Sequence, residues 1–366
     1  MSLFVLMAGG TGGHLFPAMA LAQELRRRGH QVELMTDHRV AAYGDRFPAR
    51  ETHVIPSATP SVRNPLRFLK AGFTIVYGIG LAYLKFGSVK ADAVVGFGGY
   101  PVFPPFIAAR LRGIPGVLHE QNAVMGRANR ALGRLAAAIG LSFADTKKAD
   151  GLAAKCVVVG NPVRDRVRAV VAAPYPALTA DGPLRVLVFG GSQGASVFSR
   201  IVPPAIQLLP EALRARLVLV QQVRAEDMDQ VAAAYRAAKV NVELAPFFDD
   251  LPERIAKAHL VIGRSGASSI AELCALGRPA LLVPLPGALD ADQKSNAEVM
   301  ARAGAAEILE QATLSPDLLA TRLLSRLGDA AGLAAAAEAA RTLGRPDAVT
   351  LLADLAERVA GKGRSE

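Results

Sequence analysis

The chain contains 366 residues, which is long for a single hydrophobic core, so two domains are expected. With 51% hydrophobic and 20% charged residues it has the composition of a packed protein, and two cysteines are too few for a disulfide framework. The net charge of +10 lies in residues 1–160, which hold 19 Lys and Arg against 9 Asp and Glu, and this asymmetry predicts a polyanionic partner for that half.

An anionic membrane face is favoured over nucleic acid as that partner. No nucleic-acid-binding signature is present, and aromatic residues make up only 5% of the chain. The first ten residues, MSLFVLMAGG, lack the basic segment of a secretory signal, and the two cysteines lie beside apolar runs. We therefore expect buried thiols in a reducing cytoplasm.

The chain opens with a pattern typical of α/β proteins. Residues 3–8 (LFVLMA) form an uninterrupted apolar run, which predicts a parallel strand buried on both faces. The turn GGTGGH (9–14) follows, and then a helix with apolar residues at three- and four-residue spacing that ends at Arg26–Gly29. With a second strand over 31–36, this order predicts a doubly wound α/β domain.

The glycine-rich turn at 9–14 matches neither a dinucleotide nor a Walker motif. After Gly10 and Gly12 the third glycine of G-x-G-x-x-G is absent, and no Lys-Ser or Lys-Thr pair follows. We expect a tight loop that a ligand approaches closely, with His14 at the start of the helix. A histidine there can be a capping or packing residue, but its place among four glycines at a strand end favours a chemical role.

Residues 64–90 are the most apolar part of the chain and allow two interpretations. The uncharged core, 71–84, has 14 residues, fewer than the roughly 20 of a membrane-spanning helix, so a buried helix is expected for most of it. The alternative is an interfacial helix, whose bulky side chains enter a membrane while lysines meet anionic headgroups. The residues that would do so are Lys70, Phe73, Tyr77, Lys85 and Phe86.

Three segments that follow predicted strands are expected to meet. They are the turn at 9–14, the glycines and Tyr100 at 98–100, and the polar residues HEQN at 119–122. Ligands bind outside the carboxyl ends of the strands in open α/β sheets, so these segments should converge on one cleft. Turn chemistry explains each segment alone, but three at one edge favour a site.

The second half of the chain repeats the first. A strand near 156–159 runs into GNPVR (160–164), and 160–183 is interpreted as the region between two domains. Residues 184–195 then restate 3–14 with a shift of 181, so a second doubly wound domain begins there. We assign 1–162 to the first domain and 163–344 to the second, with a helix in 345–366 that packs back on the first.

The stretch 258–297 carries a pattern expected of a nucleotide-sugar site. A strand is followed by a small-residue turn and by a helix from Ala267, whose unpaired N–H groups suit a phosphate. Glu272 could accept hydrogen bonds from the paired hydroxyls of a sugar. Asp292, Gln293 and Asn296 follow the next strand at helical spacing. An ordinary βαβ unit with polar loops is the alternative.

Six motifs occur in the order found in one family: GGTGGH (9–14), FGGY (97–100), HEQN (119–122), GNPVR (160–164), GGSQGA (190–195) and RSGASSIAEL (264–273). In these motifs, over nearly the whole chain, the sequence resembles the MurG family. The resemblance implies two Rossmann-like doubly wound domains facing a central cleft, the GT-B glycosyltransferase architecture. It also implies transfer of N-acetylglucosamine (GlcNAc) from UDP-GlcNAc to the MurNAc 4-hydroxyl of lipid I, giving lipid II for the cell wall.

The same resemblance implies a peripheral protein on the cytoplasmic face of the inner membrane, with other cell-wall enzymes as candidate partners. It places UDP-GlcNAc mainly on the second domain and gives the first domain to the acceptor and the membrane. Diphosphate would meet Ser192 and Arg164, uracil the backbone near Phe248, and ribose Glu272. Further implied contacts are Thr11, Gly12, Gly13, Asn122, Ala267, Ser268, Ser269 and Ile270 with the donor, Asp292 and Gln293 with GlcNAc, and Tyr100 with the acceptor.

A single inverting displacement is expected for such an enzyme. His14 is the candidate general base, and Glu120 is the reserve candidate. Because N–H groups, Ser192 and Arg164 would stabilise the departing diphosphate, no metal cofactor is expected. We interpret the D-x-D sequence at 290–292 as coincidence, since it does not follow a donor-binding hairpin.

Three alternatives remain open at this level. One is a related lipid glycosyltransferase, such as a diacylglycerol glucosyltransferase, against which GGTGGH and HEQN argue. Another is a UDP-GlcNAc 2-epimerase, which shares the two-domain form but needs no membrane patch. The third is an inactive membrane-bound scaffold for cell-wall enzymes. Asp292 also departs from the family pattern, since some relatives are expected to have glutamine or histidine there.

Overall fold

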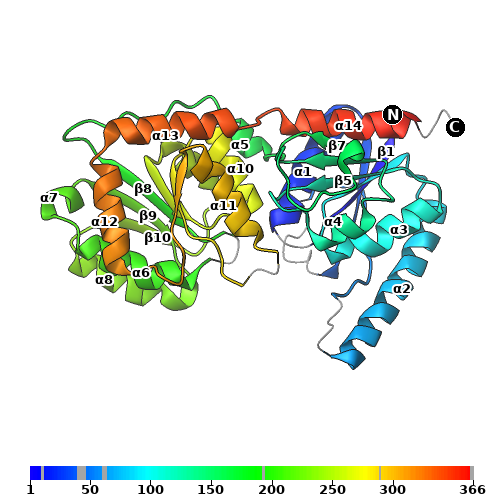
Figure 1. Cartoon of the computed structure of the whole chain (residues 1–366), viewed down its shortest axis with the longest axis horizontal. Coiled ribbons are helices and arrows are strands. Elements are labelled where there is room, and N and C mark those ends of the chain that lie inside the picture. Colours follow the sequence, from blue (N-terminus) through cyan, green and yellow to red (C-terminus); the bar gives the residue numbers. More distant parts are fainter. Residues whose placement is uncertain (10–11, 39–46, 60–63, 192–193, 288–289, 363–366) are drawn as a thin grey trace. The chain divides into compact units, whose positions relative to one another are not determined.

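The chain folds into two α/β units. The computed structural model describes residues 1–9, 12–38, 47–59, 64–191, 194–287 and 290–362. One unit comprises Met1–Asp165 and Arg345–Glu366, and the other Arg166–Gly344, so the boundary falls after Asp165 rather than after residue 162. Each unit has one parallel sheet with helices on both faces, as the sequence predicts (Figure 1). Within the described ranges, no helix has the length and apolarity needed to span a bilayer.

The sheet of the first unit has seven parallel strands in the order β3-β2-β1-β4-β5-β6-β7. They are β1 (Leu3–Met7), β2 (Gln31–Thr36), β3 (Thr52–Val54), β4 (Ala93–Gly96), β5 (Gly116–Glu120), β6 (Ala138–Leu141) and β7 (Cys156–Val158). The apolar run at the start of the chain is β1, which pairs with β2 on one side and β4 on the other. Helices cover both faces of this central strand, which explains its unbroken apolar pattern.

Helices cover the two faces of this sheet in different numbers. On one face lie α1 (Gly12–Arg27) and α14 (Ala348–Lys362), packed against side chains such as Phe4 and Val117. On the other lie α2 (Pro65–Ser88), α3 (Phe103–Leu111) and α4 (Arg127–Leu132), packed against Val5 and Leu118. Among the described residues, this unit also contains the 3-10 turns η2 (Tyr100–Val102) and η3 (Ala153–Lys155).

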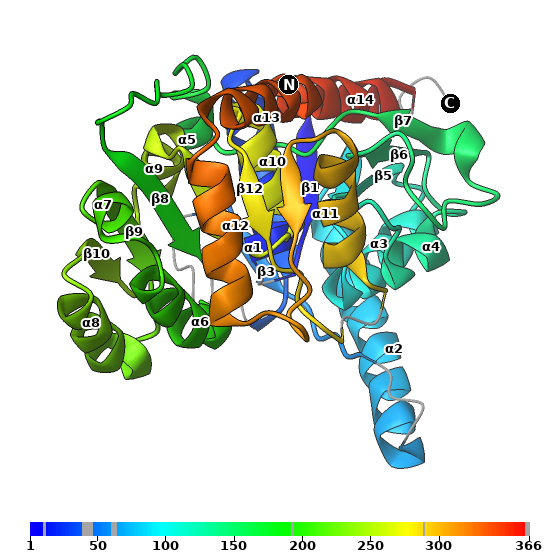
Figure 2. The ribbon, with the colours of Figure 1, turned by 60° about the vertical axis from the view of Figure 1, so that its left-hand side comes forward.

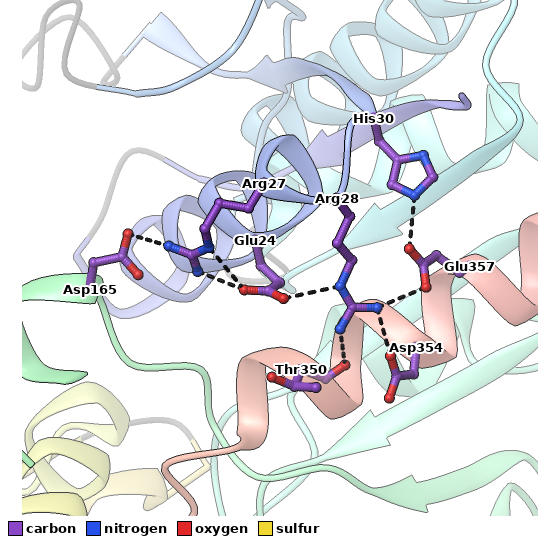
Figure 3. A network of polar contacts seen from close by, with 8 residues as sticks. All are labelled: Glu24, Arg27, Arg28, His30, Asp165, Thr350, Asp354 and Glu357. Carbon is purple, nitrogen blue, oxygen red and sulfur yellow. Dashed lines mark hydrogen bonds and ion pairs between the residues drawn. The ribbon is translucent and has the colours of Figure 1, made fainter. Parts of the chain in front are cut away.

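Charged side chains fix α14 to α1, although nearly the whole chain separates the two helices in sequence (Figure 3). Arg28 directly follows α1, and its guanidinium contacts Glu24 on that helix and reaches Asp354 and Glu357 on α14, at 2.6 and 2.8 Å. Next to it, the His30 ring lies 2.8 Å from Glu357. Beneath these contacts α14 buries an apolar face that includes Leu352, Leu355 and Val359. The C-terminal helix therefore packs on the first unit.

The second unit has a six-stranded parallel sheet in the order β10-β9-β8-β11-β12-β13. Its strands are β8 (Leu184–Phe189), β9 (Leu217–Gln222), β10 (Asn241–Ala245), β11 (Leu260–Gly263), β12 (Ala280–Leu282) and β13 (Ala306–Ile308). Its helices are α6 (Ser196–Gln207), α7 (Glu211–Arg214), α8 (Met228–Ala237), α9 (Leu251–Lys257), α10 (Ala267–Leu276), α11 (Asp292–Arg302), α12 (Pro316–Leu327) and α13 (Ala330–Leu343), with η4 (Ala225–Asp227) before α8. The short helix α5 (Asp165–Arg168) spans the boundary between the units. Figure 2 shows β12 with α10 and α11, the helices that precede and follow it in the chain.

Replacing Arg28 by alanine should loosen the C-terminal helix. The change removes charge-assisted hydrogen bonds to three carboxylates, which predicts a loss of about 1–3 kcal/mol in the free energy of unfolding. Thermal unfolding measures the loss, at roughly 2–4 °C per kcal/mol for a unit of this size. Arg358→Ala is the matched control, because this arginine is exposed on the same helix. Equal melting temperatures for the two variants would contradict the role of Arg28.

Candidate functional site

Two loops at the carboxyl edge of the first sheet lie side by side. His14, half-buried in the first turn of α1, has its ring against Gly99, where a Cβ would lie 3.4 Å from the ring's Cε1. Gly98 and Gly99 have φ values of +80° and +76°, which side chains disfavour, so glycine is needed at both positions. Tyr100 begins η2 immediately after them. The turns after β1 and β4 thus meet at His14, while Thr11 lies outside the described residues.

The loop after β5 is organised by one buried carboxylate. Oε1 of Glu120 accepts from the backbone and side-chain N–H groups of Asn122, and Oε2 accepts from Gly126 N at 2.9 Å and from Asn129 Nδ2 at 2.8 Å. Burial raises the pKa of Glu120, and these donors partly oppose that rise. Both oxygens are therefore engaged in holding the loop, and Asn129, which also lies against Gly98, links it to the turn after β4. Asn129 belongs to none of the sequence motifs, so its role is visible only in the structure.

His119, the first residue of the HEQN motif, is a buried structural residue. Its Nε2 donates to the Gly160 carbonyl at 2.9 Å, and its Nδ1 accepts from Gln121 Nε2 at 3.0 Å. Because the ring is completely buried, its pKa is lowered from 6.5 to about 4. The neutral ring joins the end of β5 to Gly160, the first residue of GNPVR.

Arg164 lies in the first unit rather than in the second domain to which the sequence assigned it. Its guanidinium stacks on the ring of Phe16 in α1, with its carbon 4.3 Å from the ring centroid. Gly12 and Gly13 form the start of the same helix. The stacking contact fixes a cation beside α1, near the segment that carries His14.

The helix α2 presents two different surfaces. Its buried residues are Ala71, Gly78, Ala82 and Phe86, which form one narrow strip, and at Gly78 a Cβ would collide with the Pro56 carbonyl oxygen. Most of the rest of the helix is exposed, including large apolar side chains such as Phe73 (75% exposed) and Leu69 (68%). The N-terminal turns of α2 extend away from the sheet of their own unit (Figures 1 and 2).

Two of the residues expected to contact a membrane have partners within their own unit. Phe86 is only 4% exposed and packs in the core beneath α2, because it lies on the buried strip. Lys85 forms an ion pair with Glu51 at 3.2 Å, so its charge is already compensated. Lys70, Phe73 and Tyr77 remain on the exposed surface of the helix.

In the second unit, the N-terminus of α10 has the features of an anion site. The helix begins at Ala267 after Gly266, and no side chain among the described residues caps it. The hydroxyls of Ser265 and Ser268 are buried and have no hydrogen-bond partner in the described part of the chain. Buried polar atoms usually have partners, so these hydroxyls and N–H groups suit a polar ligand. Ser269 and Ile270 continue the same turn, and Glu272 follows, 5% exposed.

Two buried residues hold this turn in place. Nη1 of Arg264 donates to the carbonyls of Val283 and Pro284, after β12, and Nη2 lies 2.6 Å from Gln311 Oε1. Asn296, fully buried on α11, donates to the Ser265 carbonyl at 3.1 Å. Arg264 is the first residue of the motif RSGASSIAEL, but the motif does not indicate its role, because its partners are distant in sequence.

The remaining expected donor residues lie at the start of α11 and in the loop after β10 of the same unit. Gln293 accepts from the Leu285 N–H through Oε1, which leaves its amide N–H groups for a ligand, and Asp292 opens α11. Phe248 is buried beneath the Arg254 guanidinium, 4.3 Å from its ring centroid, so the backbone is the part of this loop that can meet a ligand. Ser192 lies outside the described residues.

One group of side chains could in principle bind a metal ion. Among the described residues, only Glu33, Glu51 and His53 bring three potential ligands together. Glu33 already pairs with Arg50, and Glu51 with Lys85. These cations neutralise both carboxylates, so the cluster acts as an ion-pair network at the β2–β3 edge of the sheet.

Comparison with known proteins gives a consistent result. The family model "Glycosyltransferase family 28 N-terminal domain" matches residues 4–141, and "Glycosyltransferase family 28 C-terminal domain" matches 185–352. The chain is 52% identical over 357 residues (97% of this chain, 95% of the relative) to the UDP-N-acetylglucosamine--N-acetylmuramyl-(pentapeptide) pyrophosphoryl-undecaprenol N-acetylglucosamine transferase of Chelativorans sp.. It is 53% identical over 355 residues (96% and 95%) to the protein of the same name from Methylobacterium sp.. The crystal structure of MurG from Acinetobacter baumannii matches with a TM-score of 0.77 and 32% identity, covering 97% of this chain and 99% of that one.

The neutral ring of His119 predicts a specific loss of stability in acid. Because its pKa is lower in the folded protein than in the unfolded chain, the unfolded chain binds more protons below about pH 6.5, and stability falls as the pH falls toward 4. This group alone should lower the free energy of unfolding by about 2 kcal/mol between pH 7 and pH 5. Urea unfolding of the wild type and of His119→Gln at both pH values measures it. The variant should be less stable at pH 7 but lose less on acidification, and parallel losses would contradict a neutral buried ring.

Proposed function

The chain belongs to glycosyltransferase family 28, and from this membership we propose that it transfers GlcNAc from UDP-GlcNAc to the MurNAc 4-hydroxyl of lipid I, giving lipid II for peptidoglycan. The observation that carries the proposal is identity of about one half, over nearly the whole chain, to transferases named for this reaction. The transfer takes place at the cytoplasmic face of the membrane, where the soluble donor meets the lipid-linked acceptor.

The donor binds to the second unit. The uncapped N-terminus of α10 and the unpartnered Ser268 hydroxyl meet the phosphate and ribose region, with Ser192 at the diphosphate. Glu272 accepts from the ribose hydroxyls, since a carboxylate can accept from two neighbouring hydroxyls at once. Gln293 donates to a GlcNAc hydroxyl through the amide N–H groups that its bond to Leu285 leaves available. The phosphate, the ribose and the GlcNAc of the donor thus each meet a protein group that can form hydrogen bonds with them.

His14 removes the proton from the attacking hydroxyl. It is half-buried at the N-terminus of α1, where the helix dipole disfavours a positive charge and so favours the neutral ring that a base requires. Glu120, the reserve candidate, fits less well, because its two oxygens accept four hydrogen bonds from its own loop. The geometry favours Glu120 as the residue that keeps Asn122 in place.

The departing UDP is stabilised by fixed positive groups. Arg164, held against Phe16, supplies a full charge, and the N–H groups at helix N-termini supply partial charges. Such groups do the work that a divalent cation does in other glycosyltransferases, so the transfer is expected to proceed without added metal.

The first unit meets the membrane through α2. Its exposed apolar side chains, with Lys70 among them, suit a helix that enters the interface while a lysine meets anionic headgroups. Lipid I resides in that membrane, and the excess of basic residues in the first half of the chain attracts the unit to it. Tyr100, beside the His14 loop, lies near the acceptor sugar.

The central test is a transfer assay with labelled UDP-GlcNAc and a lipid I analogue in the presence of EDTA. The wild type should form labelled lipid II, and His14→Ala should lower turnover by about 10²–10⁴-fold while UDP binding, measured by calorimetry, stays nearly unchanged. His38→Ala is the control for loss of a histidine, because His38 is exposed and follows β2 rather than a glycine-rich turn. Wild-type turnover in His14→Ala would rule out His14 as the base. A strict need for metal would contradict the proposal that Arg164 and the N–H groups stabilise the departing UDP.

A second test addresses the membrane surface. Phe73→Asp should weaken binding to anionic phosphatidylglycerol vesicles by about tenfold or more, because burying a phenylalanine side chain contributes about 1.5–3 kcal/mol. Vesicle sedimentation measures the bound fraction. Leu208→Asp, at an exposed apolar position of the second unit, should leave binding unchanged. Equal binding by both variants would exclude α2 as the membrane contact.

A further inference from the structure

One buried side chain in the second unit connects two loops, each of which contacts a different part of the donor in the proposed site. Gln222, the last residue of β9, is 7% exposed. Its Oε1 accepts from the Gly190 N–H at 3.0 Å, and its Nε2 donates to the Pro246 carbonyl at 3.1 Å. Gly190 opens the glycine-rich loop after β8, and Pro246 opens the loop after β10. Because β9 lies between these two strands, a side chain at its end can reach both loops.

We propose that Gln222 is a positioning residue for the sugar nucleotide, which sets the distance between the loop that holds the diphosphate and the loop that meets the uracil. The inference rests on the proposed function, which gives these two loops their ligands. Uracil and diphosphate are joined covalently in the donor, so both halves bind well only if the two loops are correctly spaced. A carboxamide suits this task, because it offers one acceptor and one donor in a rigid plane.

The glycine-rich loop transmits the position of Gly190 to the helix that follows. Gly190 packs so closely on the end of its own loop that a Cβ there would collide with the backbone nitrogen of Ala195. Ala195 is the N-cap residue of α6, and no side chain among the described residues caps that helix. A shift of Gly190 therefore displaces the N–H groups at the start of α6, which are the groups available to a diphosphate.

The second loop is fixed at two points. Gln222 holds its first residue, Pro246, and the Arg254 guanidinium covers the ring of Phe248 two positions further on. Arg254 is itself held by ion pairs with Glu243 and Asp250. Loss of the Gln222 bond frees only the side of this loop that faces the glycine-rich loop, so the change affects the spacing of the two loops.

The neighbouring residue provides a matched control. Gln221 stands on the same strand and is fully buried, but successive side chains of a strand point to opposite faces, and its Oε1 accepts from the Tyr235 hydroxyl of α8. Methionine at either position has a similar length and loses the hydrogen bonds. Both substitutions therefore remove buried hydrogen bonds, two at Gln222 and one at Gln221, but only the change at Gln222 alters the spacing of the loops.

The experiment compares Gln222→Met with Gln221→Met in the full-length protein, by thermal unfolding and by calorimetric titration with UDP and with uridine. Both variants should melt at lower temperature than the wild type. Gln222→Met should bind UDP at least about tenfold more weakly, with a much smaller loss for uridine, because uridine engages only one of the two loops. In the transfer assay it should raise the KM for UDP-GlcNAc more than it lowers kcat.

Several outcomes would overturn the inference. They are UDP affinity within twofold of the wild type in Gln222→Met, an equal loss in Gln221→Met, or equal losses for uridine and UDP. If Gln222→Met does not fold, Gln222→Glu takes its place. Glutamate keeps an acceptor for the Gly190 N–H, but its carboxylate repels the Pro246 carbonyl oxygen. The same results are expected of this variant. A wild-type protein that failed to bind UDP would instead refute the donor-site assignment, so the two failures are distinguishable.

Discussion

Hydrogen bonds from buried polar side chains to loop backbone are the interaction on which both sites depend. At the carboxyl edge of each sheet the chain leaves a strand and must satisfy its backbone groups without regular partners. In the first unit Glu120 does this for the loop after β5, and in the second unit Arg264 and Asn296 do it for the turn before α10. These loops are consequently held by groups that would be costly to leave unpaired, and a ligand meets a surface already in place.

The same arrangement divides the titratable side chains near the proposed site into buried and half-buried groups. Glu120 and His119 are buried and serve the loop, whereas His14 and Arg164 are half-buried beside α1. Supporting residues are thus separated from residues that can meet a substrate. The C-terminal helix contributes to this support, because the contacts of Arg28 with Asp354 and Glu357 keep α14 on the face of the sheet that α1 also covers.

The helix α2 meets a different constraint. A helix on the surface of a protein that stays in water normally shows one apolar stripe and a polar outer face. In α2 the buried strip is narrow, and large apolar side chains such as Leu69 and Phe73 point outward as well. The proposed contact with a membrane would remove the cost of this exposure, because the outer side of the helix would then face an apolar solvent.

The sequence by itself determined the main secondary-structure elements and the α/β fold class. Apolar runs such as 3–8 and 184–189 became central parallel strands, the glycine turns fell at their carboxyl ends, and the helix expected from Ala267 to Leu276 has those bounds. Such features depend on neighbouring residues, so a linear pattern contains them. The strand β3, three residues long, gave too short a pattern to be detected.

Only the tertiary structure decided which side chains meet. A helix that is apolar on all sides gives no periodic signal for its buried face, so only packing places Phe86 in the core and Phe73 outside it. The stacking of Arg164 on Phe16, the bond from Asn129 to Glu120 and that from Gln222 to Gly190 join residues from different strands or helices. These contacts depend on strand order and on the direction of each side chain at a strand end, and neither is written in the local sequence.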